Sequence, residues 1–163
     1  MVETKITKAL EKSDCVVRAI ASATGLGYDK AYTFCLQELK RKPKCGVRRN
    51  LLLMGIGRLS KFGLVVTPKI GIMSIRPGIS HCDLISHNRQ NKKPGSMTVN
   101  KVLKTYPTGT FLALARDHMF VIKDGTIIGN KSDGTKLRVQ IKDLWEIGWS
   151  STFLSILATL NEK

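Results

Sequence analysis

The sequence predicts an α+β protein in which N-terminal helices pack on a C-terminal antiparallel sheet. Apolar residues recur at helical spacing up to residue 62, whereas short apolar or alternating segments bounded by turn residues dominate after residue 109. Helices followed by strands, rather than alternating with them, are typical of an α+β fold. The chain of 163 residues shows no internal repeat and no second-domain boundary, so one domain is expected.

The first helix is expected at residues 14–23. Val16 and Ile20 lie on one face at helical spacing, and Ala23 continues that face. Ser13 is the predicted N-cap, because its hydroxyl can accept a hydrogen bond from the first turn. Gly25 provides the expected end of the helix.

Two more helices are expected before residue 63. The apolar positions from Tyr28 to Lys40 follow the i, i+3, i+4 pattern, which predicts a helix that places Cys35 in the core. A third helix is expected at about Arg48–Phe62. Gly55 and Gly57 weaken this helix, because glycine is a poor helix former.

Turn residues then break the chain into shorter elements. Leu64–Thr67 is predicted to be a short strand that ends at Pro68. Residues 71–95 are rich in Gly, Pro, Ser, Asn and basic residues, and this composition predicts a loop. A short helix is expected at Thr98–Tyr106.

The last third of the chain is expected to form the sheet and a closing helix. An Asp124-Gly125 turn is predicted to join two of its strands as a hairpin. The expected strands are Thr110–Ala115, Met119–Lys123, Thr126–Gly129 and Leu137–Ile141, while Trp145–Trp149 is a fifth strand or a turn, and Thr152–Leu160 is the closing helix.

Basic residues are concentrated in the middle of the chain. Lys plus Arg number 27 against 12 Asp plus Glu, a net charge of +15, and residues 40–104 carry fifteen of the bases and one acid, Asp83. This imbalance predicts contact with a polyanion, either the phosphates of a nucleic acid or an acidic protein surface. The residues predicted to make that contact are Lys40, Arg41, Lys42, Lys44, Arg48, Arg49, Lys92 and Lys93.

Cysteine usage and hydropathy favour a reducing, intracellular compartment. The four cysteines form no CxxC pair, and the sequence has neither a signal-peptide stretch nor an apolar run long enough to span a membrane. No membrane partner, cofactor or metal is therefore predicted. The segment His81-Cys82-Asp83 with His87 fits no familiar zinc spacing, and Cys45 is expected to be an exposed bystander.

Cys15 is the candidate nucleophile, because the first turn of a helix lowers the pKa of a thiol. His118, at the start of a predicted strand, is the candidate base, with His81 or His87 as a weaker alternative. The hairpin brings the far end of the next strand to the same sheet edge, so Asn130 is the candidate residue that orients His118. Asp133 is the substitute if the register differs.

These residues resemble a known family. The segment Ser-Asp-Cys15-Val-Val-Arg-Ala-Ile-Ala resembles the nucleophile helix of small papain-like cysteine peptidases, especially forms encoded by bacteriophages. The segment from Gly109 through His118 to Asn130 is similar to that family's second signature, a strand, a His, a strand and an Asp-Gly hairpin ending in Asp or Asn. The chain order of Cys, His and Asn is also that of papain.

The resemblance implies a single papain-like domain over residues 1–163, with a basic helix and loop insert at about 40–104. It also implies a cysteine hydrolase with the triad Cys15, His118 and Asn130, acting on a peptide, an isopeptide or another amide. A phage origin implies a location in the host cytoplasm or carriage in the virion.

A second hypothesis belongs to a different class. The chain has no Gln before Cys15, where papain-like enzymes use one to hold the oxyanion; the first is Gln37. Together with the basic middle, this predicts a non-catalytic nucleic-acid-associated or virion structural protein on a papain-like scaffold. Hydrogen-bond contact between Cys15 and His118 favours the enzyme, and wide separation or a plugged cleft favours the binding protein.

Overall fold

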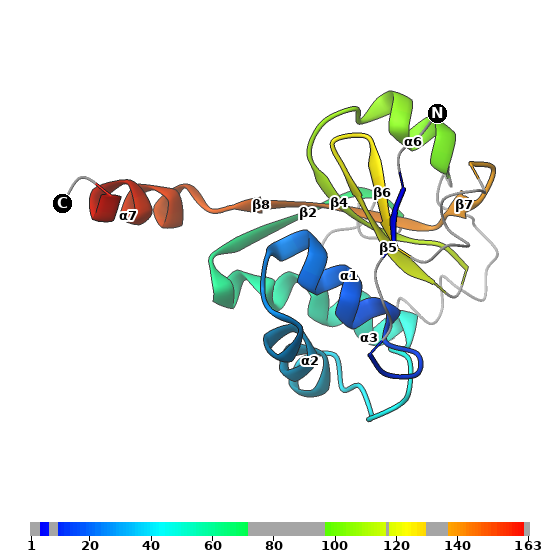
Figure 1. Cartoon of the computed structure of the whole chain (residues 1–163), viewed down its shortest axis with the longest axis horizontal. Coiled ribbons are helices and arrows are strands. Elements are labelled where there is room, and N and C mark those ends of the chain that lie inside the picture. The colour runs from blue at the N-terminus through cyan, green and yellow to red at the C-terminus, as the bar shows by residue number, and fades with distance from the viewer. Residues whose placement is uncertain (1–3, 7–9, 72–96, 117, 130–136, 162–163) are drawn as a thin grey trace.

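The structure is a computed structural model that describes residues 4–6, 10–71, 97–116, 118–129 and 137–161 (Figure 1). It confirms the α+β class. The helices are α1 (Cys15–Thr24), α2 (Tyr28–Gln37), α3 (Arg49–Gly55), the 3-10 helix η1 (Ile56–Phe62), α6 (Val99–Thr105) and α7 (Ser151–Asn161). The strands are β1 (Thr4–Ile6), β2 (Leu64–Ile70), β3 (Met97–Thr98), β4 (Thr110–Leu114), β5 (Met119–Lys123), β6 (Thr126–Gly129), β7 (Gln140–Ile141) and β8 (Asp143–Trp149).

The main sheet has the strand order β1-β6-β5-β4-β8-β2. Its strands from β6 to β2 are antiparallel to their neighbours, and β1 is added in parallel to β6 at one edge. The sequence did not predict β1. A separate two-stranded ladder pairs β3 with β7.

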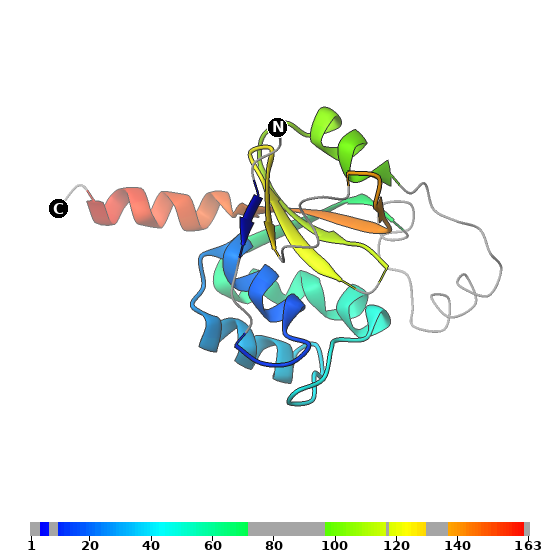
Figure 2. The same cartoon turned by 45° about the vertical axis from the view of Figure 1, so that its right-hand side comes forward.

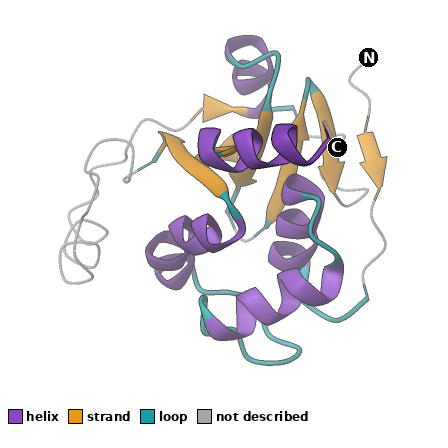
Figure 3. Ribbon diagram, turned by 90° about the vertical axis from the view of Figure 1, so that its left-hand side faces the viewer, coloured by secondary structure: helices purple, strands orange, loops and turns teal. Residues whose placement is uncertain are grey.

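The sheet separates two apolar layers. The face carrying Leu112, Leu114 and Val121 packs against α1, α2, α3 and η1. The opposite face carries Phe111 and Ile122 and packs against α6. Figures 1 and 3 show this arrangement, with α1, α2 and α3 gathered on one side of the sheet. Alternate residues of β4 thus serve opposite layers, as the period of a strand requires.

The β5–β6 hairpin forms as the sequence predicts. Asp124 and Gly125 have φ angles of 47° and 76°, the left-handed conformation that a tight two-residue hairpin turn requires. The paired positions Val121 and Ile128 fix the register. The hairpin therefore places the start of β5 beside the end of β6. Helix α1 packs against both strands.

The boundaries of the first two helices differ from the prediction. The N-cap of α1 is Asp14 and not Ser13, whose φ of 59° places it in the turn that leads into the helix. The predicted end at Gly25 is correct, because Gly25 takes the left-handed conformation. Helix α2 ends at Gln37, three residues before the predicted Lys40, which itself has a positive φ of 51°.

The predicted third helix is divided at Gly55 into α3 and η1. A Cβ on Gly55 would lie 2.5 Å from Leu39 Cδ2 and 2.9 Å from the carbonyl oxygen of Glu38. Glycine at this position therefore allows the end of α2 to approach closely. Gly57 is exposed, with nothing near its Cβ position.

Strand β2 is longer than the sequence predicts. It continues through Pro68 to Ile70, with an irregularity in its pairing to β8 between these two residues. Pro68 is tolerated because β2 is an edge strand. It pairs with β8 alone, so a residue without an N–H can be accommodated there.

The C-terminal third combines correct and incorrect predictions. The strand predicted at Leu137–Ile141 is reduced to Gln140–Ile141 and lies outside the main sheet, while Trp145–Trp149 belongs to a strand and not to a turn. Helix α7 forms, but it projects from the body as a continuation of β8 instead of closing the core (Figures 1 and 2). The predicted loop at 71–95 lies almost entirely outside the described residues.

The contact at Gly55 predicts the effect of two substitutions. Gly55→Ala should lower the free energy of unfolding by about 1–3 kcal/mol, because the new methyl group overlaps the backbone of Glu38. Gly57→Ala, its matched control, should change stability by less than about 0.5 kcal/mol. Urea unfolding followed by circular dichroism measures both. Equal effects at the two glycines would contradict this account of the α2–α3 contact.

Candidate active site

The structure brings Cys15 and His118 together. Cys15 is the first residue of α1, and His118 immediately precedes β5, against which α1 packs. The thiol and the imidazole share a hydrogen bond, although the two residues are 103 positions apart in the sequence. His118 is held in turn by a backbone hydrogen bond of 2.9 Å from the N–H of Ala115 to its carbonyl oxygen, and its ring stacks on Phe120.

The surroundings of Cys15 favour the thiolate. Burial by itself raises the pKa of this half-buried thiol. Hydrogen bonds from His118 and from the backbone N–H groups of Met119 and Val16, together with the charge of His118, outweigh that effect and lower the pKa below its ordinary value. The N–H groups and macrodipole of the first helical turn act in the same direction. Cys15 therefore has the electrostatic environment of a reactive cysteine.

A small cavity adjoins the pair. Its volume is about 10 Å³, roughly the space that one water molecule needs. Helix α1 contributes one wall, and β5 with the end of β6 contributes the other. The lining residues are Cys15, Arg18, Ala19, Ser22, His118, Met119, Phe120, Ile128 and Gly129.

The third predicted member of the site, Asn130, lies outside the described residues, as does its substitute Asp133. Gly129, the residue before Asn130 in the sequence, lines the cavity beside His118. The alternative bases His81 and His87 also lie outside the described residues. So do Cys82 and Asp83, the other residues of the segment that was compared with zinc-site spacings.

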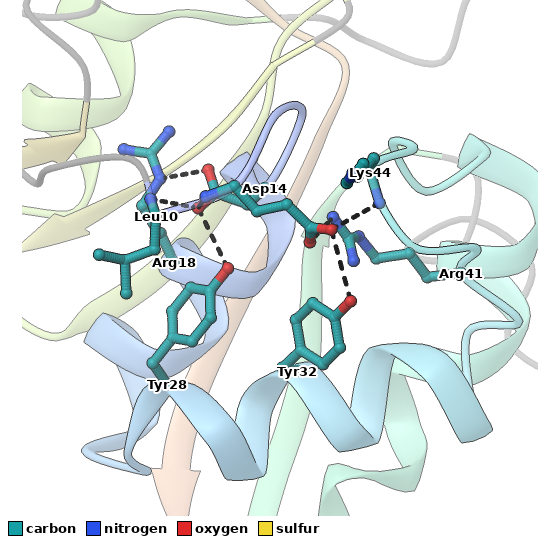
Figure 4. Close-up of polar contacts among 8 residues, drawn as sticks. Leu10, Asp14, Arg18, Tyr28, Tyr32, Arg41 and Lys44 are labelled. Atoms are coloured by element: carbon teal, nitrogen blue, oxygen red, sulfur yellow. Dashed lines mark hydrogen bonds and ion pairs between the residues drawn. The ribbon is translucent and has the colours of Figure 1, made fainter.

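Asp14, the residue before Cys15, anchors the start of α1 (Figure 4). Asp14 is 1% exposed, and its Oδ2 accepts hydrogen bonds from the backbone N–H groups of Leu10 and Glu11 at 3.0 and 3.1 Å. Its Oδ1 accepts one from Arg18 Nε at 2.7 Å, one helical turn further on. The hydroxyl of Tyr28 on α2 donates a further bond of 3.2 Å.

These donors keep Asp14 ionised. Burial alone raises the pKa of its carboxyl group, but the two backbone donors and Arg18 lower it below the ordinary value. Burial and the Asp14 carboxylate together raise the pKa of Tyr28 to about 12. Arg18 is buried and paired with Asp14, so it braces the start of the helix.

A second carboxylate ties the same loop to the end of α2 (Figure 4). Glu11 accepts bonds of 2.9 Å from Arg41 Nη2 and 2.7 Å from the backbone N–H of Lys44, and Tyr32 donates to it at 3.5 Å. The guanidinium carbon of Arg41 lies 5.0 Å from the centre of the Tyr32 ring. Nε and Nη1 of Arg41 are buried without a hydrogen-bond partner among the described residues, so this ring contact partly replaces the missing partners.

The predicted polyanion contacts therefore divide into two groups. Arg41 is buried against Glu11, and Arg49 pairs with the buried Asp143 through bonds of 2.7 and 2.9 Å, so both bases already have an acidic partner inside the fold. The predicted surface role of Arg41 is thus incorrect, because its side chain is fully buried. The exposed members are Lys40, Lys42, Lys44 and Arg48, whereas Lys92 and Lys93 lie outside the described residues.

The remaining described thiols differ from Cys15. Cys35 is buried in the core as the sequence predicts, and burial raises its pKa to about 12. Cys45 is exposed in the loop between α2 and α3. Cys35 and Cys45 therefore provide a protected and an accessible internal reference for the reactivity of Cys15.

Sequence reasoning missed several contributors to the site. The backbone N–H of Met119 and the network centred on Asp14 were not predicted. The spacing of Asp14 and Arg18, four residues apart at a helix start, was the available signal, because such residues face each other on a helix. No comparable signal identified Tyr28, because its partner is fourteen residues away on another element.

Comparison with known proteins finds no match for this chain among family models, curated proteins or solved structures. In the described part of the chain, no helix has the length and apolar character needed to cross a bilayer. The described residues also contain no group of three His, Cys, Asp or Glu side chains arranged to hold a metal ion.

The Asp14 network predicts a large, pH-dependent effect on stability. Asp14→Asn removes the negative partner of buried Arg18, so the free energy of unfolding should fall by about 3 kcal/mol at neutral pH. The folded pKa of Asp14 is depressed, so its contribution exists above the unfolded value of about 3.9 and is lost as the pH falls through the folded value. The difference in the free energy of unfolding between wild type and Asp14→Asn should therefore become smaller at acid pH.

Urea unfolding across a pH series measures this gap. Asp29→Ala is the control, because Asp29 is an exposed carboxylate in the first turn of α2 and should cost less than about 1 kcal/mol. A gap for Asp14→Asn that stays constant into acid would show that the ionised carboxylate is not what stabilises the fold.

Proposed function

We propose that the protein is a papain-like cysteine hydrolase in which Cys15 is the nucleophile, His118 the general base and acid, and Asn130 the residue that orients His118. One observation carries this proposal: the thiol of Cys15, at the start of α1, is hydrogen-bonded to His118 and has a lowered pKa. A core cysteine needs neither a histidine partner nor this position, as buried Cys35 illustrates.

The chemistry follows from these groups. The thiolate of Cys15 attacks the carbonyl carbon of an amide, and the carbonyl electron pair moves to the oxygen. When the tetrahedral intermediate collapses, the C–N bond breaks and the imidazolium of His118 gives its proton to the leaving nitrogen. A thioester on Cys15 remains. Water, deprotonated by His118, attacks the thioester, the C–S bond breaks, and the acid leaves.

Helix α1 supplies the electrostatic support. The first N–H groups of a helix have no acceptor within it, so those at Cys15 and Val16 can stabilise negative charge on the substrate oxygen or on sulfur. This arrangement would take over the part played by the Gln that the chain lacks before Cys15. The proposed substrates are a peptide, an isopeptide or another amide, which all require the same groups.

The architecture supports the papain-like part of the proposal. The nucleophile begins a helix that packs on an antiparallel sheet, the histidine begins a strand of that sheet, and the chain order is Cys15, His118, Asn130. The resemblance of both signatures to phage-encoded peptidases adds a phage origin to the proposal, with a place of action in the host cytoplasm or virion.

The proposal predicts how the Cys15 thiol reacts with iodoacetamide. Alkylation of Cys15 should proceed at pH values well below the ordinary thiol pKa of about 8.5, because the thiolate is stabilised. In His118→Ala the pH profile should move upward, since the hydrogen bond and charge of the imidazole are lost. Mass spectrometry of peptides reads Cys15, Cys35 and Cys45 separately in one sample.

The control variant is Cys45→Ser, which should leave the Cys15 profile unchanged, and Cys35 should stay unmodified while the protein is folded. A Cys15 profile that does not respond to His118→Ala would contradict the activated pair. If hydrolysis of a peptide or isopeptide library is found, its persistence in Cys15→Ala would contradict the mechanism.

A second function is favoured by the loop between α2 and α3. Lys40, Lys42, Lys44 and Arg48 are exposed within nine residues, and none takes part in the side-chain ion pairs found among the described residues. We infer that this basic loop, defined as residues 40–48, contacts the phosphates of a nucleic acid. Such contacts position a backbone without reading sequence.

Salt dependence tests this second function. The affinity for duplex DNA should fall as salt rises, and Lys42→Ala with Lys44→Ala should reduce the slope of log affinity against log salt by about 2. Fluorescence anisotropy with a labelled duplex measures this, and Lys123→Ala, an exposed lysine far along the chain in β5, is the control. Binding that is absent at low salt, or unchanged by salt, would exclude the phosphate contact.

A further inference from the structure

Among the described side chains, those that anchor α7 to the body lie at its first turn. The N–H of Ser150 donates to the carbonyl of Gly63 at 2.8 Å, and the N–H of Phe153 donates to the hydroxyl of Ser150 at 3.2 Å. The Phe153 ring stacks on Trp149, with centroids 4.8 Å apart, and covers Gly63. The root of the helix is therefore fixed to the body by specific contacts.

Beyond this root the helix projects away from the body (Figures 1 and 2). Leu154 and Ile156 are 50% and 54% exposed, and Trp149 at the root is 42% exposed. We define the arm as Trp149 and α7. An exposed apolar surface that is held in place by an anchored root is typical of an interaction site.

The arm differs in charge from the rest of the chain. Residues 143–161 contain two acids and no Lys or Arg, in a chain whose net charge is +15, and α7 itself is uncharged. One of those acids, Asp143, is already paired with Arg49, and the other, Glu146, with Lys69. The arm is therefore a surface on which two strongly basic molecules can meet without direct repulsion between like charges.

The polar side of α7 also suits burial. The hydroxyl of Ser155 donates to the carbonyl of Ser151, and that of Thr159 donates to the carbonyl of Ser155, each at 2.9 Å. Because the helix satisfies these hydroxyl donors itself, enclosing them in an interface leaves no unpaired donor. Helices that lie on membrane surfaces instead carry Lys and Arg on the polar side, and α7 has none.

We propose that the arm binds the arm of a second copy of this chain, forming a dimer with two-fold symmetry. In such an interface each surface must complement itself, and residues near the axis meet their own copies. An uncharged apolar helix meets that condition, whereas the basic surface of the same protein does not. This inference goes beyond the proposed hydrolase and does not depend on it.

The size of the arm sets the expected affinity of the dimer. An eleven-residue helix is about 16 Å long, and a pair of such helices buries less than the roughly 1,600 Å² of a standard stable interface. The dimer should therefore dissociate in the micromolar range. Added salt should strengthen it by screening the repulsion between the two basic bodies, whereas salt weakens nucleic-acid binding.

Sedimentation equilibrium of nuclease-treated protein at several salt concentrations tests the proposal. Wild type should approach twice the 18.1 kDa chain mass as concentration rises, and more readily in high salt. Ile156→Lys should weaken the dimer at least tenfold, because the two-fold axis introduces the charge twice. Met54→Lys, at a residue 47% exposed on α3, is the matched control and should dimerise as wild type does.

Circular dichroism and urea unfolding establish that each variant is folded. A wild-type protein that stays monomeric at all salt concentrations would overturn the proposal. So would a dimer that tolerates Ile156→Lys, or a monomer that floats with phosphatidylcholine vesicles through α7.

Discussion

The buried carboxylate of Asp14 is the interaction on which the candidate site depends. It joins the loop before α1, the first turn of α1 and the start of α2 through four hydrogen bonds. Cys15 follows directly, so its place at the helix start is set by its neighbour. Because the charge is almost fully excluded from solvent, the loss of any donor leaves it poorly compensated. The candidate nucleophile therefore follows a buried carboxylate that several donors hold in place.

The sheet supplies the other half of the site. The β5–β6 hairpin places His118 and Gly129 side by side at the ends of their strands, and α1 packs against both strands. The apolar contacts of Val121 and Leu112 hold helix and sheet together, while the turn at Asp124 and Gly125 fixes which residues reach the edge. A thiol and an imidazole far apart in sequence thus meet beside a cavity of about 10 Å³.

Local signals predicted much of this, and long-range contacts set the rest. Helix α1 and the β5–β6 hairpin follow from a capping glycine and from turn chemistry, which are local rules. The pairing of Cys15 with His118 joins residues 103 positions apart, and the resemblance to papain-like peptidases, not a local rule, led us to expect it. The sequence predicted that β2 ends at Pro68, because proline interrupts an inner strand. That β2 lies at the edge of the sheet, where proline is tolerated, is a property of the whole fold. Arg41 looked like a surface base because its partner Glu11 is thirty residues away. Similarly, no local sequence signal shows that α7 projects from the body instead of covering the core.

The central claim is that His118 lowers the pKa of the Cys15 thiol by stabilising its thiolate. The most direct test is a pH titration of the thiolate by its ultraviolet absorbance, taken as the difference between wild type and Cys15→Ala and repeated in the His118→Ala background. The account predicts a transition below the ordinary thiol pKa of about 8.5 that moves upward without His118. A transition at or above the ordinary value, or one that ignores His118, would contradict the account.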